Sequence, residues 1–242
     1  MAPAGYGSRV EGIHAVAAAV AAGRVERLTV ERKRRSRQEI AGLINAVGEA
    51  RTVYVDDARD IADTEAPQGV VADCAPILPV ELDSMAIQNA AIIVLDHLED
   101  PQNVGAIARS AAAGGCTGLV MSGRRSAPLS AAAFKAAAGA LERIPVAVVG
   151  SIPDALRRLK SHDVWAVGLD RGGDQSLFGL SLFTEPVAVV IGAEGEGLSE
   201  LTAKRCDVVA SIPMADESES LNASVSAALA IFEIMRVRKP LR

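Results

Sequence analysis

Residues 211–236 read SIPMADESESLNASVSAALAIFEIMR, and the rest of the chain is organised around this stretch. Its first half is not expected to form regular structure, because Pro213 removes a backbone donor and the polar side chains of residues 216–220 bond to nearby backbone. From Leu221 on, apolar residues recur at steps of three and four, which predicts a helix that begins there with Ser220 as its N-cap. Free N–H groups at that start suit a polar ligand, although on this segment alone a capped helix behind a solvated loop is the favoured explanation, because helix caps are so common.

The composition of the 242 residues favours layered α/β structure. Half of the residues are apolar, but only one Trp, two Tyr and four Phe are present. A core made mostly of Ala, Val, Leu and Ile fits α/β layers, and so few aromatic side chains argue against RNA binding by rows of stacked rings.

The charge is unevenly distributed along the chain. The net charge is −5, yet residues 24–37 contain seven basic and two acidic side chains, so this segment is +5 and the remainder is −10. Local sign matters more than the total for phosphate binding, because charges are screened within about 10 Å at ordinary salt. A solvated helix start is an equal alternative for this segment. If it binds RNA, the candidates are Arg32, Lys33, Arg34 and Arg35.

The three cysteines and three histidines are far apart and lack metal-ligand spacing, so no metal is expected. We interpret Cys74, Cys116 and Cys206 as buried thiols in a reducing compartment. The strand-like apolar runs are far shorter than the roughly 20 residues of a membrane span. We therefore expect no membrane association and a cytoplasmic location.

The first third of the chain predicts a small α/β unit. Residues 1–9 are expected to be disordered, and residues 76–89, with Pro76 and Pro79, are expected to be a linker. Between them, helices are expected at residues 11–22 and 36–49, and strands at 27–30, 52–55 and 69–74. The predicted boundaries are 1–75 for this unit, 76–89 for the linker and 90–242 for a second domain.

From residue 90 on, strands and helices alternate, which predicts a parallel sheet with helices on both faces. Strands are expected at 92–95, 118–121, 146–149, 165–169, 187–191 and 208–212, and helices at 104–113, 131–141, 153–160 and 199–205. Ligands of such sheets bind beyond the carboxyl ends of the strands. The residues that follow each strand are therefore the candidates for function.

Three of these places have unusual polar content. Residues 96–109, DHLEDPQNVGAIAR, include Asn103 and Arg109, which taken alone are explained as a helix cap and a solvated helix residue. Residues 191–199, IGAEGEGLS, contain three glycines in the order GxxGxG, the reverse of the dinucleotide fingerprint, with Glu194 among them. The third place is the stretch quoted first, at Ser220 to Asn222.

Together these motifs resemble those of the SpoU-type (TrmH-like) RNA ribose 2′-O-methyltransferases of the SPOUT class, and most of all the type that modifies a guanosine of 23S rRNA. DPQNVGAIARSA at 100–111 is similar to the family's DPxNxGAxxRSA. The segment from Val189 to Gly195 and beyond is similar to its (V/I)xGxExxG, and IPM with SLNASVSA at 212–227 to its third motif. The likeness covers residues 90–236. GIHAV and QGVVA, within residues 10–75, resemble landmarks of the family's ribosomal-protein-like RNA-binding domain.

The resemblance implies features that the residue patterns alone do not predict. These are a C-terminal deep trefoil knot, bound S-adenosylmethionine (AdoMet), and an obligate homodimer with its active sites at the interface. By position it implies cofactor contacts from Leu169, Gly192, Ile212, Met214 and Leu221. It implies a catalytic group made of Asn103, Arg109, Glu194, Ser220 and Asn222.

The chemistry would be methyl transfer to a ribose 2′-hydroxyl held in line with the methyl group. A guanidinium loses its proton only far above neutral pH, and deprotonating it at pH 7 costs roughly 8 kcal/mol. We therefore expect Arg109 to bind a substrate phosphate and stabilise the developing alkoxide rather than act as the base. The leading hypothesis is 2′-O-methylation of a 23S rRNA guanosine. Alternatives are a transfer RNA ribose methyltransferase and a catalytically silent RNA-binding or assembly protein, while the missing fingerprint disfavours a nicotinamide-dependent oxidoreductase.

Overall fold

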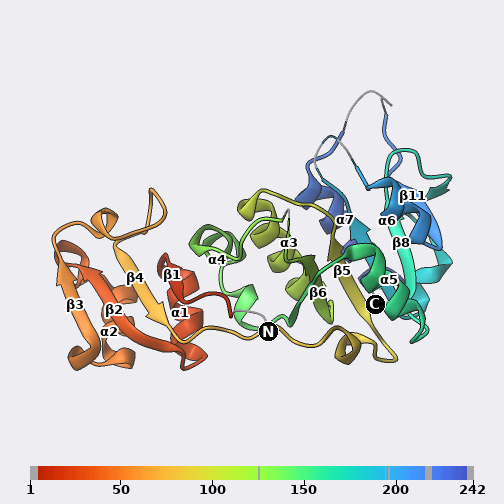
Figure 1. Cartoon of the computed structure of the whole chain (residues 1–242). Helices are drawn as coiled ribbons and strands as arrows, with labels where there is room; N and C mark the ends of the chain where they lie inside the picture. The colour runs from red at the N-terminus through yellow and green to blue at the C-terminus, as the bar shows by residue number, and fades with distance from the viewer. Residues whose placement is uncertain (1–4, 125, 194, 196, 216–219, 239–242) are drawn as a thin grey trace.

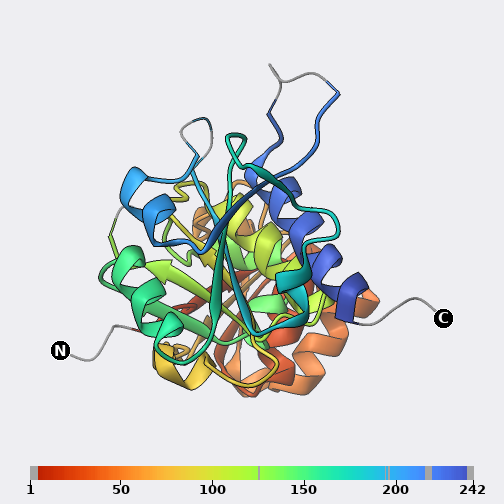
Figure 2. The same ribbon diagram turned by 90° about the vertical axis from the view of Figure 1, so that its right-hand side faces the viewer.

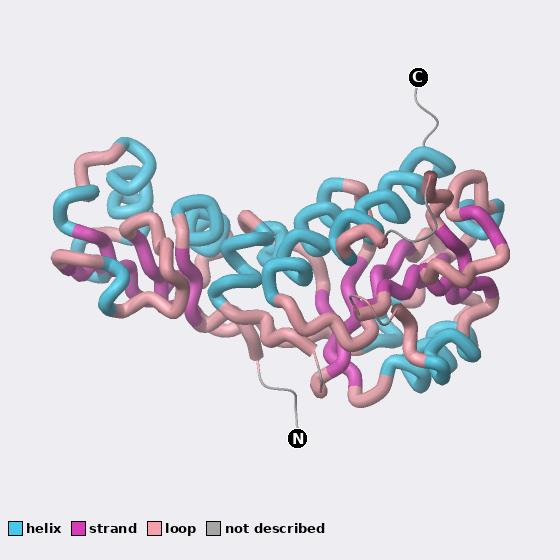
Figure 3. The backbone as a smooth tube through the Cα atoms, turned by 90° about the horizontal axis from the view of Figure 1, so that it is seen from above, coloured by secondary structure: helices cyan, strands magenta, loops and turns pink. Residues whose placement is uncertain are grey.

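The computed structural model describes residues 5–124, 126–193, 195, 197–215 and 220–238. The chain forms two β-sheets that lie at opposite ends of an elongated molecule (Figures 1 and 3). A continuous apolar core joins them.

The smaller sheet is mixed, with strand order β1-β4-β2-β3. β2 is parallel to β3, and β4 is antiparallel to both β1 and β2. The strands are β1 Arg9–Glu11, β2 Val25–Glu31, β3 Thr52–Val55 and β4 Val70–Cys74, and the helices are α1 Ile13–Ala21 and α2 Gln38–Val47. The helix and strand types predicted for this unit agree with these elements. One side of α2 is buried because Ile40, Leu43, Ile44 and Val47 recur at helical spacing.

The prediction of a disordered start at residues 1–9 is wrong for the described part, residues 5–9. Tyr6 and Ile77 exchange two backbone hydrogen bonds, of 2.9 and 2.8 Å, and β1 begins at Arg9. The strand is only three residues long, too short to show an alternating apolar pattern. Residues 1–4 lie outside the described residues.

The larger sheet is entirely parallel, with order β7-β6-β5-β10-β8-β11-β9. Its strands are β5 Ala91–Leu95, β6 Gly118–Ser122, β7 Val146–Val149, β8 Trp165–Leu169, β9 Gln175–Ser176, β10 Val187–Ile191 and β11 Val208–Ser211. The helices are α3 Pro101–Ala113, α4 Ala131–Ala137, α5 Ile152–Lys160, α6 Glu200–Arg205 and α7 Ala223–Arg238. The two-residue β9 is the one strand of this sheet that the sequence analysis missed.

Both faces of the larger sheet are covered, as predicted. Along β5, Ala91, Ile93 and Leu95 belong to the core shared with α3 and α7. Ile92 and Val94 belong to a second core shared with α5 and with the connecting segment before β5. Figure 2 shows α7 on one side of the strands and α5 and α6 on the other. Burial on both sides explains why the strands read as continuous apolar runs.

Residues 76–89 connect the two sheets, and part of this segment packs against the larger one. They include a short 3-10 helix, η4 Leu82–Met85, in which Leu82 and Met85 are buried. The Val80 N–H donates to the Val146 carbonyl over 2.9 Å. The sequence analysis did not predict this packing, because the two apolar residues are isolated among polar ones.

The contact between the two halves centres on Arg24 and Phe134. Arg24 donates to both carboxylate oxygens of Glu142, over 2.7 and 2.5 Å, and the side chains of the pair are 12% and 3% exposed. Arg24 also donates to the backbone carbonyls of Gly7 and Ala75. Phe134 of α4 is fully buried. The two halves therefore share one interior rather than being separated by solvent.

Candidate functional site

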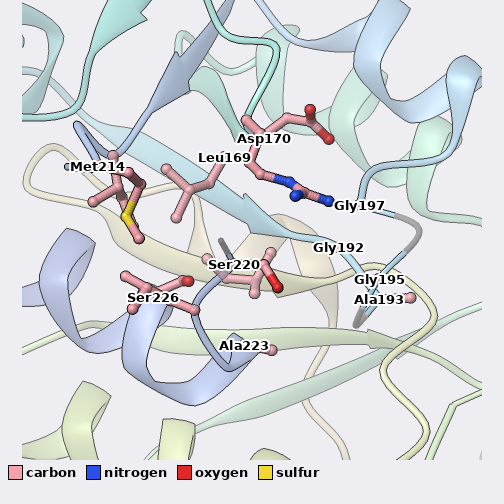
Figure 4. Close-up of a pocket in the computed structure, with 14 residues that line it drawn as sticks. Leu169, Asp170, Gly192, Ala193, Gly195, Gly197, Met214, Ser220, Ala223 and Ser226 are labelled. Carbon is pink, nitrogen blue, oxygen red and sulfur yellow. The ribbon is translucent and has the colours of Figure 1, made fainter. Parts of the chain in front are cut away.

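A pocket of about 160 Å³ opens at the carboxyl ends of β8, β10 and β11 (Figure 4). The five residues predicted to contact a cofactor all line it, and so does Ser220. These positions come from three segments far apart along the chain. The remaining lining residues are Asp170, Arg171, Ile191, Ala193, Gly195, Gly197, Ala223 and Ser226.

Glycine is required where the backbone of this pocket is most tightly packed. A Cβ on Gly192 would lie 2.2 Å from the Gly197 carbonyl oxygen, and one on Gly197 would lie 2.3 Å from Asp170 Oδ2. Ala193 and Gly197 exchange backbone hydrogen bonds of 3.1 and 3.0 Å, which closes a tight turn. Glu194, predicted as a catalytic residue, lies outside the described residues.

Asn103 and Asn222 are brought together from 119 positions apart. The Asn222 amide Nδ2 donates to Asn103 Oδ1 over 3.1 Å, and Asn103 is buried in the first turn of α3. The cap of α3 is Asp100, which accepts from the Gln102 N–H over 2.8 Å, so the cap interpretation of Asn103 is wrong. The asparagine pair joins the first turn of α3 to the start of α7.

The start of α7 differs from the prediction. The helix begins at Ala223, and Asn222 Oδ1 accepts from the N–H and the Oγ of Ser224, over 2.8 and 2.6 Å. Asn222 rather than Ser220 therefore caps the helix, because an asparagine carbonyl reaches the N–H two residues on as well as a serine hydroxyl does. Ser220 is exposed and faces the pocket instead.

Arg109 lies away from the pocket of its own chain. It is exposed on α3, six residues after Asn103, which is about 240° around the helix. It is not among the residues that line the pocket. Within one chain, the structure thus unites Asn103 and Asn222 and places Ser220 in the pocket, but it does not bring Arg109 to them.

The predicted RNA-binding residues form what we call the basic turn, residues 32–35. Arg32 to Arg34 make a 3-10 helix, η1 Arg32–Arg34, directly after β2. Arg32 lies 3.6 Å from Asp56, while Lys33 and Arg34 lie 2.7 and 3.2 Å from the buried Glu31. These carboxylates offset part of the local positive charge. Arg32, Lys33 and Arg35 line a shallow cavity together with Asp56.

The cysteines are unsuited to catalysis. All three are free; Cys74 is buried, but Cys116 and Cys206 are only partly buried, which corrects the expectation for those two. Burial raises the pKa of Cys74 to about 11 and the pKa values of Cys116 and Cys206 to about 12. At neutral pH very little of each thiol is therefore the nucleophilic thiolate.

The described residues hold neither a metal-binding cluster nor a membrane-spanning helix. No three His, Cys, Asp or Glu side chains converge there in a way that would hold a metal ion. No helix in the described ranges is long and apolar enough to cross a membrane.

Sequence reasoning missed Asp170, Arg171 and Ser226. A signal for the first two was present, because they follow a predicted strand directly, where ligands of parallel sheets bind. Ser226 is on the first turn of α7 and gave no local signal. A parallel sheet with a glycine-lined, partly apolar pocket at its carboxyl edge defines an α/β protein built to bind a nucleotide-like small molecule.

Comparison with known proteins gives the family. The chain belongs to the SpoU rRNA Methylase family, whose model matches residues 90–232. A second model, described as RNA 2′-O ribose methyltransferase substrate binding, matches residues 9–79. The resemblance drawn from the motifs is thereby confirmed.

Several curated relatives are similar to the chain. An uncharacterised tRNA/rRNA methyltransferase of Synechocystis is 44% identical over 177 residues, which are 71% of this chain and 46% of the relative. The 23S rRNA (guanosine-2′-O-)-methyltransferase RlmB of Xylella fastidiosa is 42% identical over 177 residues, 71% of each protein. The chain spans about half the length of most of the curated relatives it matches.

Solved structures share the fold over nearly the whole chain. The SpoU methyltransferase AviRb of Streptomyces viridochromogenes, in complex with AdoMet, has a TM-score of 0.81 and 28% identity, covering 97% of this chain and 91% of that one. An rRNA methyltransferase of Sinorhizobium meliloti has a TM-score of 0.77 and 25% identity, covering 95% and 86%.

Proposed function

We propose that the chain is an AdoMet-dependent RNA ribose 2′-O-methyltransferase whose substrate is a guanosine of 23S rRNA. The observation that carries the proposal is the convergence of Leu169, Gly192 and Leu221, with Ile212 and Met214, in one pocket. The family and the name of the Xylella relative support both the activity and the ribosomal substrate. As ribosomal RNA is made and assembled in the cytoplasm of a bacterium, we expect this protein to work there.

The pocket suits AdoMet by its shape and lining. Leu169, Ile212 and Leu221 supply apolar surface for an adenosine, and Gly192 and Gly197 leave backbone exposed where side chains would fill the space. AviRb, whose fold matches over nearly the whole chain, binds AdoMet. When bound, this cofactor supplies an electrophilic methyl group on a sulfonium.

The polar residues would then position the ribose. The asparagine pair fixes the first turn of α3 against α7, and Ser220 presents a hydroxyl to the pocket. In this assignment Asn103, Ser220, Asn222 and Glu194 orient the ribose and Arg109. Arg109 binds the substrate phosphate and stabilises charge on the 2′-oxygen, because a guanidinium donates strong bidentate hydrogen bonds but resists deprotonation.

Arg109 can take that role if two copies of the chain pair. It is exposed on α3, and the adjacent helix α7 exposes Val225 and Phe232, at 46% and 44%, with Leu221 just before it. Apolar side chains seven residues apart form a stripe along one helix face. We propose a homodimer through this face, in which Arg109 of one copy completes the site of the other.

The same proposal includes the knot and the division into domains. β10 lies between β5 and β8, and the later β11 lies outside β8 before α7 returns to pack on α3. This crossing order supports a deep trefoil knot in a SPOUT domain at residues 90–242. Residues 1–75 would be the RNA-binding domain, in agreement with the substrate-binding model at 9–79, with 76–89 as the linker.

Calorimetric titration with AdoMet, followed by tritium transfer from labelled AdoMet, tests the proposal. We expect 1:1 binding per chain and label in the ribose of 23S rRNA. If only transfer RNA becomes labelled, transfer RNA rather than 23S rRNA is the substrate. Cofactor binding without transfer to any RNA, or no binding, would contradict the enzymatic function.

A further inference from the structure

Two carboxylates outside the predicted catalytic group follow the two strands that lie on either side of β10. In the larger sheet β10 lies between β5 and β8, and each of these neighbours is followed at once by an aspartate, Asp96 after Leu95 and Asp170 after Leu169. Because parallel strands end at the same edge, both side chains reach the segment that follows β10.

Each aspartate accepts a backbone hydrogen bond from that segment. Asp170 Oδ2 accepts from the Leu198 N–H over 3.2 Å, and Asp96 Oδ2 accepts from the Ser199 N–H over 3.2 Å. The two donors are consecutive, so the chain is held from both sides at one point. The bonds join the strands on either side of β10 to the residues that close the pocket.

The two remaining carboxylate oxygens differ. Asp170 Oδ1 accepts from the Gly172 N–H over 2.9 Å. Asp96 Oδ1 is buried and accepts no hydrogen bond from the described residues, although it lies 2.7 Å from His97 Nδ1. The Asp96 side chain is fully buried. Burying a carboxylate costs free energy unless it is hydrogen-bonded, so the bond that Asp96 accepts from the Ser199 N–H calls for a function. At Asp170 an amide would keep only one acceptor oxygen, and its NH₂ group would face the Leu198 or the Gly172 N–H donor.

The clamped residues are directly coupled to the pocket wall. Gly197 and Asp170 both line the pocket, and the absence of a side chain at Gly197 is what lets Asp170 Oδ2 approach. Gly192, on the opposite wall of the turn, packs against the Gly197 carbonyl. Release of residues 197–199 would therefore displace the glycine backbone on both sides of the turn.

We propose that Asp96 and Asp170 are positioning residues, which clamp residues 197–199 between β5 and β8 and so hold the glycine backbone in its cofactor-binding shape. The inference deepens the proposed function and rests on it for the identity of the ligand. The clamp itself is a property of the free protein, and it can be measured without any ligand.

The test uses three single variants of the full chain: Asp96→Asn, Asp170→Asn and the control Asp207→Asn. Asp207 Oδ2 accepts from the Ala166 N–H over 2.9 Å and pairs with Lys160, but at the opposite end of β8. The control therefore removes the same kind of bond far from the pocket. Unfolding by urea identifies any variant that fails to fold.

Amide hydrogen exchange in the absence of AdoMet tests the clamp directly. Asp170→Asn should speed exchange at Leu198 at least tenfold and Asp96→Asn should do so at Ser199, while Asp207→Asn changes neither. Unchanged protection of both amides in the two clamp variants would refute the clamp. Should Asp96→Asn not fold, Asp170→Asn alone still decides the outcome.

Calorimetry then tests the consequence for the cofactor. Each clamp variant should raise the Kd for AdoMet about tenfold, which equals about 1.4 kcal/mol, and Asp207→Asn should stay within twofold. If the wild-type protein does not bind AdoMet, the proposed function fails while the exchange result stands. If the wild type binds and Asp170→Asn binds equally tightly, the positioning role is refuted.

Discussion

The pocket of the larger sheet and the basic turn of the smaller sheet are built in opposite ways. The pocket is assembled from strand ends that are distant along the chain, and much of its wall is backbone packed at van der Waals distance. The basic turn consists of consecutive residues, exposed except for the half-buried Arg34, whose charges repeat one another and are partly offset by Glu31 and Asp56. Single changes should therefore be severe in the pocket region and mild in the basic turn.

The largest effect is expected at Arg109. Arg109→Ala should lower methylation on the order of 10²- to 10³-fold, because a donor to developing charge is lost, yet leave the Kd for AdoMet within a few-fold. Single-turnover tritium transfer and calorimetry measure the two quantities. Loss of cofactor binding would instead assign Arg109 to the cofactor side and contradict its role toward RNA.

The second-largest effect is expected when the ion pair between Arg24 and Glu142 is broken. Arg24→Ala leaves Glu142 buried without its partner, which should lower the free energy of unfolding by about 3 kcal/mol. Asp154→Ala is a matched control, because its pair with Arg157 is exposed and should contribute less than about 1 kcal/mol. Urea denaturation compares them. Equal effects would mean that the two halves are not coupled through a buried pair.

Alanine substitutions at two glycines should have different effects, because one glycine lies in tightly packed backbone and the other in open space. Gly192→Ala places a Cβ 2.2 Å from a carbonyl oxygen, so overpacking should cost about 1–3 kcal/mol and weaken AdoMet binding. Gly150→Ala follows β7 at the same edge, and a Cβ there has nothing within 4 Å. Calorimetry should show weak binding only for the first variant. If Gly192→Ala binds AdoMet as tightly as the wild type, the cofactor binds at another site.

The smallest effect per residue is expected in the basic turn. Replacing Arg32, Lys33, Arg34 and Arg35 together by glutamine should weaken RNA binding about tenfold at physiological salt and flatten its dependence on salt, because fewer counterions are released. Any one replacement alone should have little effect. Filter binding over a series of salt concentrations measures both. An unchanged slope would place the RNA surface elsewhere.

Much of the fold could be predicted because the apolar strands are buried on both faces. The runs at 146–149, 165–169 and 187–191 match their strands residue for residue. The elements that the sequence did not predict are short or depend on the residues they pack against. β1 and β9 are too brief to show a period, and the packing of Leu82 and Met85 depends on the sheet beneath them.

The candidate site shows the same limit. Leu169, Gly192 and Leu221, which the resemblance assigned to the cofactor, line one pocket. Motif positions could not show that Asn222 caps α7 while pairing with Asn103, or that Arg109 lies on another helix face. Those facts depend on how helices are rotated against one another, which no local pattern specifies.

A crystal structure of the chain grown with AdoMet tests the central claim most directly. We predict electron density for the cofactor against Leu169, Gly192 and Leu221, in a pair of molecules related by a twofold axis that brings Arg109 of one copy to the pocket of the other. A cofactor bound elsewhere, or a saturated pocket with Arg109 of every copy remote from it, would contradict the account.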